Sequence, residues 1–159
     1  YEKVLSHLPK QPPTLLFLDL THKNDYKGRL YIKLEPELHA FIKNVPELFT
    51  GKNGKSILGN TCGGSSGCLA IWIQNSVKEI SSFRGQSILV NSGAVLCNFS
   101  GNSIRGMFLC LDSTKTYNSN YAKLGHIVYG LEVAQTCKAL GLIQQVNIKI
   151  SDCGLVLES

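Results

Sequence analysis

Cysteine is the residue type with the widest chemistry in this chain of 159 residues, which contains six of them. Cys62 and Cys68 are separated by Gly63-Gly64-Ser65-Ser66-Gly67, whereas a zinc knuckle or a redox pair needs the shorter Cys-x-x-Cys spacing. The other four lie in apolar segments, where a reduced cysteine behaves as a small hydrophobic residue: Cys97, Cys110, Cys137 and Cys153. The sequence therefore predicts no metal site, and reduced thiols favour an intracellular location.

A second candidate is Gly54-Lys55-Ser56, which matches the end of a phosphate-binding loop. The full pattern, Gly-x-x-x-x-Gly-Lys-Ser/Thr, also requires a glycine at position 49 and a strand leading into the loop. Position 49 is Phe49, and no strand is predicted before it. We therefore expect neither a phosphate site nor any other cofactor.

The charge of the chain could suggest nucleic-acid binding, because the formal net charge is +5 and the pI is about 8.9. The basic residues are scattered singly from Lys3 to Lys149, without the run or helical stripe that usually marks such a surface. Apolar runs such as Leu15–Leu18 and Cys68–Ile73 are much shorter than the roughly 18 residues that a membrane helix needs. A membrane-spanning helix is excluded by this pattern, and nucleic-acid binding is disfavoured.

The elements that would position functional residues begin after a Pro-rich stretch. Residues 1–12 end in Gln11-Pro12-Pro13 and are predicted to be a linker. The apolar run 15–20 and the alternating segment 29–34 predict a β-hairpin. From residue 37 to 49 the apolar spacing becomes helical.

The rest of the chain is predicted to be mainly β. Short apolar segments bounded by Gly, Asn and Ser predict strands at 68–73, 87–90, 94–97, 107–111, 127–129, 146–150 and 155–157. A second helix is predicted over 131–140, ending at Gly141, and 52–67 is predicted to be a loop. Many short strands separated by turns favour an antiparallel barrel or a sandwich.

Several segments, taken in order, resemble the cyclophilins. These are Phe17-Leu18-Asp19-Leu20 with Gly28-Arg29, Asn44-Val45-Pro46-Glu47-Leu48-Phe49-Thr50-Gly51, Gly106-Met107-Phe108-Leu109, Leu124-Gly125-His126-Ile127-Val128-Tyr129-Gly130 and Ser151-Asp152-Cys153-Gly154-Leu155. The resemblance implies a domain over 13–158 with a closed eight-stranded antiparallel β-barrel capped by two helices. It also implies a binding groove on the outside of the barrel, because side chains fill the interior of a barrel of this size.

The family activity implied by the resemblance is peptidyl-prolyl cis-trans isomerisation. An X-Pro bond isomerises slowly because rotation breaks amide resonance across a barrier of about 18–20 kcal/mol. Cyclophilins use a guanidinium to weaken that resonance, from a Phe-His-Arg-Val-Ile-Pro segment that this chain lacks. When Ile71-Trp72-Ile73-Gln74 is aligned with the family's Phe-x-x-Gln, the arginine position falls near Ser66, which supplies no permanent charge.

The resemblance assigns the remaining groove positions residue by residue. They are Ile71, Gln74, Asn98, Phe99, Arg105, Met107, Leu109, Tyr121 and His126. Of these, Arg105 is the candidate to replace the missing arginine. Met107 and Leu109 alternate with Phe108 and Cys110 on one strand, and the pattern alone leaves open which pair faces the core.

These residues lead to one preferred hypothesis and two alternatives. The preferred one is a cyclophilin-like pseudo-isomerase that acts as a protein-interaction module of a larger intracellular protein. It would be monomeric by itself and would bind a protein or peptide, including proline-containing ones. The first alternative is an active or weakly active peptidyl-prolyl isomerase with an altered groove, and the second is a nucleic-acid binding module.

Overall fold

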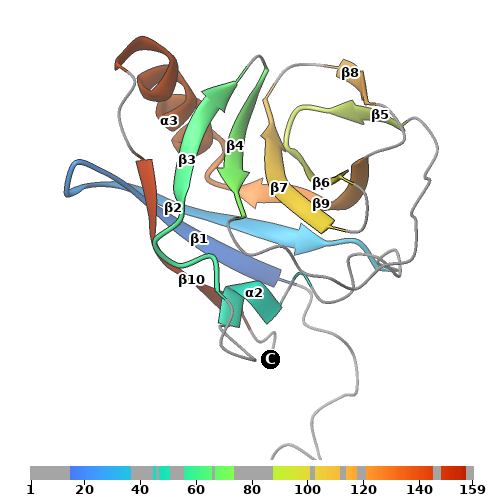
Figure 1. Ribbon diagram of the computed structural model, residues 1–159, viewed down its shortest axis with the longest axis horizontal. Coiled ribbons are helices and arrows are strands. Elements are labelled where there is room, and N and C mark those ends of the chain that lie inside the picture. Colours follow the sequence, from blue (N-terminus) through green and yellow to red (C-terminus); the bar gives the residue numbers. More distant parts are fainter. Residues whose placement is uncertain are drawn as a thin grey trace, which may run out of the picture.

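The structure is a computed structural model, and it describes residues 15–36, 45, 47–50, 56–65, 67–73, 88–100, 103–111, 114–117, 121–144 and 148–156. These ranges are mainly β (Figure 1). The strands are β1 (Leu15–His22), β2 (Asp25–Leu34), β3 (Thr61–Ser65), β4 (Cys68–Trp72), β5 (Ile88–Asn91), β6 (Ala94–Ser100), β7 (Ser103–Cys110), β8 (Thr114–Tyr117), β9 (Tyr121–Tyr129) and β10 (Ile148–Val156). The helices are α2 (Glu47–Thr50) and α3 (Leu131–Gln144).

Eight of these strands close into an antiparallel barrel in the order β1-β10-β3-β4-β7-β6-β9-β2. The two helices lie at opposite ends of the barrel (Figure 1), with α3 against β2 and β3 and α2 against β10. The predicted eight-stranded barrel with two helices is therefore confirmed. Most of the first predicted helix, 37–44 together with Pro46, lies outside the described residues.

The interior of the barrel is filled by alternate residues of each strand. Leu16, Leu18 and Leu20 of β1 and Leu30 and Ile32 of β2 are all 0% exposed and belong to one apolar cluster. Burying a side chain of this size contributes about 1.5–3 kcal/mol, so this alternation accounts for much of the stability of the barrel. The residues between them face outward, and the functional candidates are found among such outward positions.

Two glycines let α3 close one end of the barrel. At Gly28 an added Cβ would lie 2.7 Å from Cγ2 of Val133, so the start of the helix packs directly on the backbone of β2. Gly130 has a φ of 88°, which glycine adopts without strain, and its carbonyl accepts the Val133 N–H at 2.9 Å. The helix then continues to Gln144, past the predicted end at Gly141. A glycine costs a helix only about 1 kcal/mol, which the packing of the preceding turns outweighs.

The strands β2, β7 and β9 begin four to six residues before their predicted starts, and three further strands differ more from the sequence prediction. β3 falls in the predicted loop: its Gly-rich sequence has low strand propensity, but ladders to β10 and β4 on its two sides override that preference. The two predicted C-terminal strands form one continuous strand, β10, with an irregular register opposite Asp19 and Leu20. The segment 114–117, for which no strand was predicted, is β8, and it pairs with β5 outside the barrel.

Candidate functional site

The outward side of β4 and β7 carries a connected row of aromatic side chains, which we call the aromatic row: Trp72, Phe108, Tyr121 and Tyr117. The ring centroids of Trp72 and Phe108 are 6.3 Å apart, those of Phe108 and Tyr121 5.6 Å, and those of Tyr121 and Tyr117 5.0 Å. All three contacts are tilted or edge-on, the arrangement that aromatic pairs prefer. Trp72 is 49% exposed, so one end of the row is open to solvent.

Strand alternation and register explain why these rings meet. On β4 and β7, Ala70 is opposite Phe108, and both belong to a small apolar cluster separate from the barrel interior. Tyr121, at the start of β9, packs against this cluster. Tyr117 is delivered from β8, whose pairing with β5 places a two-stranded sheet beside the barrel. The row is thus built from three consecutive strands, β7, β8 and β9, together with β4, which comes about 30 residues before them in the sequence.

Two thiols lie beneath the Tyr117 end of the row. The Tyr117 hydroxyl is 3.4 Å from Sγ of Cys110 and 3.9 Å from Sγ of Cys68. Burial raises the pKa of Tyr117, and the hydrogen bond with Cys110 raises it further. The hydroxyl therefore stays protonated at neutral pH and acts as a donor or acceptor, not as a charge.

Of the predicted groove residues, the structure brings Asn98 and Tyr121 together. They are directly opposite on β6 and β9, and both are partly exposed. Burial raises the pKa of Tyr121, and a hydrogen bond with the Asn98 side chain opposes part of that shift. Asn98 thus supplies a polar group beside the aromatic row, and Gly106, its partner on β7, is in turn opposite Trp72 on β4.

Three predicted groove residues are instead in the barrel interior, which corrects their placement. Ile71, Met107 and Leu109 are each 0% exposed and belong to the main core cluster. Ile71 and Met107 are opposite each other on β4 and β7. A side chain enclosed in this way has no surface to offer a peptide. The outward residues of β7 are Phe108 and Cys110, which settles the alternation that the sequence left open.

Arg105 and His126 are both exposed, and neither is one of the four residues of the row. Asn98 pairs with Gly106 and Phe99 with Ile104, so Arg105 is the extra residue of a β-bulge in β7. His126 is five residues beyond Tyr121, about 16 Å along β9 at about 3.3 Å per residue, and lies opposite Lys33 of β2. Bulges re-aim side chains, so Arg105 is the better placed of the two to serve a ligand.

Three further positions are described only in part or not at all. Gln74 and Ser66 lie outside the described residues, and of Phe99 only the backbone, within β6, is described. The residues that sequence reasoning missed are Phe108, Tyr117 and Trp72 as a joined surface. The alternation of inward and outward residues on β7 could have predicted that Phe108 faces outward. Nothing in the sequence predicted that β8 lies beside the barrel.

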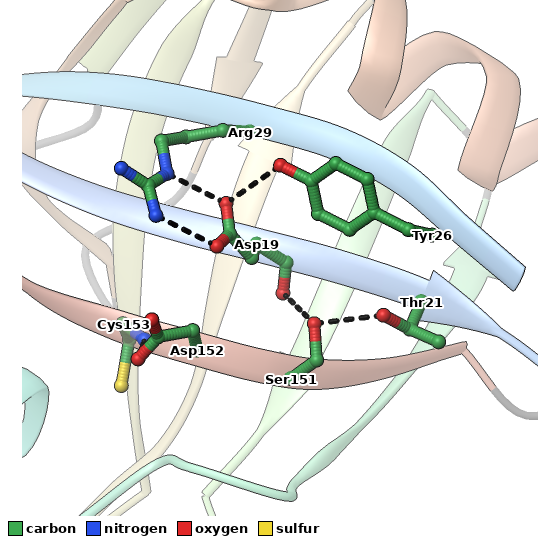
Figure 2. A network of polar contacts seen from close by, with 7 residues as sticks. All are labelled: Asp19, Thr21, Tyr26, Arg29, Ser151, Asp152 and Cys153. Atoms are coloured by element: carbon green, nitrogen blue, oxygen red, sulfur yellow. Dashed lines mark hydrogen bonds and ion pairs between the residues drawn. The ribbon is translucent and has the colours of Figure 1, made fainter. Parts of the chain in front are cut away.

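A second outward surface lies on β1, β2 and β10, where Asp19 is the centre of a polar network (Figure 2). Arg29 donates from Nε and Nη2 to the two carboxylate oxygens of Asp19, at 2.7 and 2.9 Å, and Tyr26 donates at 3.1 Å. Ser151 donates to the Asp19 carbonyl at 3.3 Å and accepts from Thr21. Asp19 is only 7% exposed, and these bonds satisfy its charge.

The same surface continues into an apolar hollow. The Arg29 guanidinium lies 4.1 Å above the centre of the Phe17 ring. Further along the strands is a shallow, open hollow of about 390 Å³, lined by Leu15, Tyr31, Val128, Tyr129 and Val156. Its exposed aromatic residue, Tyr129, has 65% of its surface in solvent and provides a natural control for experiments on Trp72.

Neither surface shows metal chemistry. Among the described residues, no three His, Cys, Asp or Glu side chains are grouped in a way that could bind a metal ion. No helix in the described ranges combines the length and the apolar character needed to cross a membrane.

Comparison with known proteins gives a match in structure but not in sequence. No protein-family model matches the chain, and no curated protein matches it. Among solved structures, the crystal structure of the Mimivirus cyclophilin matches with a TM-score of 0.67 and 17% sequence identity. The match covers 97% of this chain and 95% of the Mimivirus chain.

Proposed function

We propose that this chain, which has the fold of the cyclophilins, is a pseudo-isomerase domain that binds a protein or peptide partner through the aromatic row. The observation that carries the proposal is a surface with aromatic and polar groups for recognition but, within the described residues of β3 and β4, no guanidinium for catalysis. Trp72 offers an exposed ring, and Asn98 offers an amide beside Tyr121. Aromatic surfaces of this kind suit proline-containing segments, which dock with little loss of entropy.

The strand that leads to Ser66, near which the resemblance places the catalytic arginine, supports this proposal. β3, which pairs with β4 along the margin of the row, has the sequence Thr61-Cys62-Gly63-Gly64-Ser65 and contains no arginine. A Cβ added at Gly63 would lie 3.8 Å from Nε1 of Trp72, so the backbone next to the indole carries no side chain. A preorganised donor contributes about 3 kcal/mol or more to transition-state stabilisation, and β3 has no guanidinium to act as one.

The positions of the three arginines limit which of them could supply a catalytic guanidinium. Arg29 is engaged by both oxygens of Asp19 on β1 and β2, and Arg84 lies outside the described residues. Arg105, exposed in the β7 bulge, is therefore the residue that favours the second candidate function, a weakly active isomerase. The proposal of a pseudo-isomerase requires that Arg105 gives no measurable turnover.

Exchange NMR on a short X-Pro peptide tests the catalytic half of the proposal. We expect no acceleration of cis-trans exchange at micromolar concentrations of the chain. Acceleration that Arg105→Ala abolishes would establish the alternative. Acceleration that survives Arg105→Ala would also reject the pseudo-isomerase and would direct the search to Arg84.

The binding half can be followed through the single tryptophan, Trp72, whose fluorescence reports directly from the aromatic row. Proline-containing peptides should change its emission on binding. Trp72→Ala should weaken binding, followed by a labelled peptide, by about tenfold or more, the scale of a buried aromatic hot spot. Tyr129→Ala, the matched control in the hollow, should leave the affinity unchanged. Equal losses from both variants would show that the aromatic row is not the binding surface.

We also propose that the domain acts within a larger intracellular protein and is monomeric by itself. The oligomeric state is checked by light scattering on the purified chain. Salt-sensitive binding to RNA or DNA would instead support the nucleic-acid alternative. The +5 charge alone gives no reason to expect such binding.

A further inference from the structure

Two of the six cysteines face each other across neighbouring strands. Cys68 of β4 is directly opposite Cys110 of β7. The next pair along this ladder, Gly67 and Leu111, is joined by a hydrogen bond from the Leu111 N–H to the Gly67 carbonyl, at 2.8 Å. Antiparallel pairs alternate between hydrogen-bonded and non-hydrogen-bonded, so Cys68 and Cys110 form a non-hydrogen-bonded pair.

That position sets how close the two residues come. In a non-hydrogen-bonded pair the Cα atoms are about 4.5 Å apart and the side chains lie on the same face of the sheet. Disulfides span Cα separations of about 4.4–6.8 Å. The Tyr117 hydroxyl is 3.4 Å from one Sγ and 3.9 Å from the other, so both sulfur atoms lie on the face of the sheet that Tyr117 covers.

The other cysteines lack this combination. Cys62 and Cys97 are directed into the barrel core, with Cys62 opposite Ile71 and Cys97 opposite Met107. Cys137 is in the same core cluster, and Cys153 on β10 is opposite Leu18. Cys68 and Cys110 are therefore the two cysteines that the sheet holds opposite each other, and they lie outside the barrel beneath Tyr117.

We propose that Cys68 and Cys110 form a reversible disulfide when the protein is exposed to oxidised glutathione. One protein thiolate attacks a sulfur of the oxidised glutathione and releases one glutathione thiolate. The second protein thiolate then attacks the mixed disulfide and releases the other. The two protein thiols lose two electrons, the glutathione disulfide gains them, and the two protons go to the departing glutathione thiolates. The products are one protein disulfide and two molecules of reduced glutathione.

The disulfide would alter the aromatic row by displacing Tyr117, which covers the two thiols. Cys68 and Cys110 are 4% and 2% exposed, so Tyr117 must move aside before glutathione can reach them. Once the bond forms, Cys110 can no longer donate its thiol hydrogen to the Tyr117 hydroxyl, and Tyr117 contacts Tyr121 in the row. Formation of the bond is independent of the proposed function. Its effect on peptide affinity rests on that function.

The test is mass spectrometry of the full chain after equilibration with mixtures of reduced and oxidised glutathione. We expect a species that has lost two hydrogen atoms and that dithiothreitol returns to the original mass. Digestion should link the peptide containing Cys68 to the peptide containing Cys110. Because Cys62 shares a tryptic peptide with Cys68, fragmentation between the two assigns the bond. Cys68→Ser and Cys110→Ser should each lose the cross-linked product, and Cys153→Ser, the matched control, should retain it.

A second measurement, the alkylation of each cysteine, uses the wild-type protein alone and so does not depend on whether a variant folds. After oxidation and denaturation, Cys68 and Cys110 should lose their reactivity towards an alkylating reagent in parallel, while the other four cysteines keep theirs. Stable mixed disulfides with glutathione and no cross-link would overturn the proposal. A cross-link between Cys62 and Cys137 would do the same.

Discussion

On the outward side of β1 and β2, the buried carboxylate of Asp19 accepts three hydrogen bonds, two from the Arg29 guanidinium and one from the Tyr26 hydroxyl, and that guanidinium is stacked on an aromatic ring. On the outward side of β4 and β7, four aromatic rings and two thiols occupy a comparable position with no ion pair between them. The first surface satisfies its charge within the chain, so it has little left for a ligand. The second leaves an indole 49% exposed and an amide beside it. The two faces of the barrel therefore differ in one respect. The polar groups of the first are bonded within the chain, whereas the second leaves side-chain groups exposed to a ligand.

The largest expected effect is on the aromatic side. Phe108 is 9% exposed and lies between Trp72 and Tyr121, so Phe108→Ala should lower the free energy of unfolding by about 3–5 kcal/mol, measured by urea denaturation. Tyr129→Ala is the control and should change it by about 0.5 kcal/mol or less, because that ring is largely in solvent. A loss below about 1 kcal/mol for Phe108→Ala would mean that the row contributes no packing.

The next effect is on the polar side. Asp19→Ala removes charge-assisted hydrogen bonds from Arg29 and Tyr26, and should cost about 1.5–3 kcal/mol. Asp19→Asn keeps the shape and one acceptor and should cost less. The same denaturation experiment checks both variants. If Asp19→Asn were as damaging as Asp19→Ala, the charge would be essential; if neither mattered, the contrast between the two faces would fail.

The smallest effect concerns the thiols of the interior. Burial raises the pKa of Cys62 and Cys97 to about 12 and that of Cys137 to about 11. A raised pKa removes the reactive thiolate, so at pH 8 these three should be alkylated far more slowly than the half-buried Cys153. Peptide mapping after timed alkylation measures the order. Rapid labelling of Cys97 in folded protein would contradict the described core.

The raised pKa values also have a consequence for stability at alkaline pH. The unfolded chain loses these thiol protons near pH 9, whereas the folded chain holds them until about pH 11–12. The unfolded state is thus favoured increasingly as the pH rises through this window. The free energy of unfolding should fall between pH 9 and 11, and less so after Cys97→Ala when each variant is compared with its own value at pH 7.

The sequence predicted the barrel because its repeated local features agree with the fold. Alternating residues such as Leu30 and Ile32 mark the inward side of a strand, and the turns between strands are rich in Gly, Asn and Ser. It missed β3, because Gly63 and Gly64 have no intrinsic preference for a strand. Only the neighbouring ladders of β4 and β10 make that segment extended.

The candidate site was predicted less well than the barrel. The resemblance placed Met107 and Leu109 in the groove, but a shift of one residue moves every side chain of a strand to the other face. Phe108 and Cys110 therefore take the outward positions. Asn98 and Tyr121 were assigned to the groove separately, and the register between β6 and β9 makes them neighbours. The loss of the catalytic arginine could be predicted without a structure, because the sequence lacks the Phe-His-Arg-Val-Ile-Pro segment.

The closed strand order has a consequence for how the chain is made. β10 lies between β1 and β3, so Leu15 cannot complete its ladder until its partner Val156 has been synthesised. At about 5–20 residues per second, β1 and β2 wait on the order of ten seconds for that strand. During this interval β1 and β3 each present an unpaired edge, the kind of surface that other chains can join. Folding of this domain must therefore finish after most of it has left the ribosome. Before β10 docks, chaperones can bind the unpaired edges of β1 and β3.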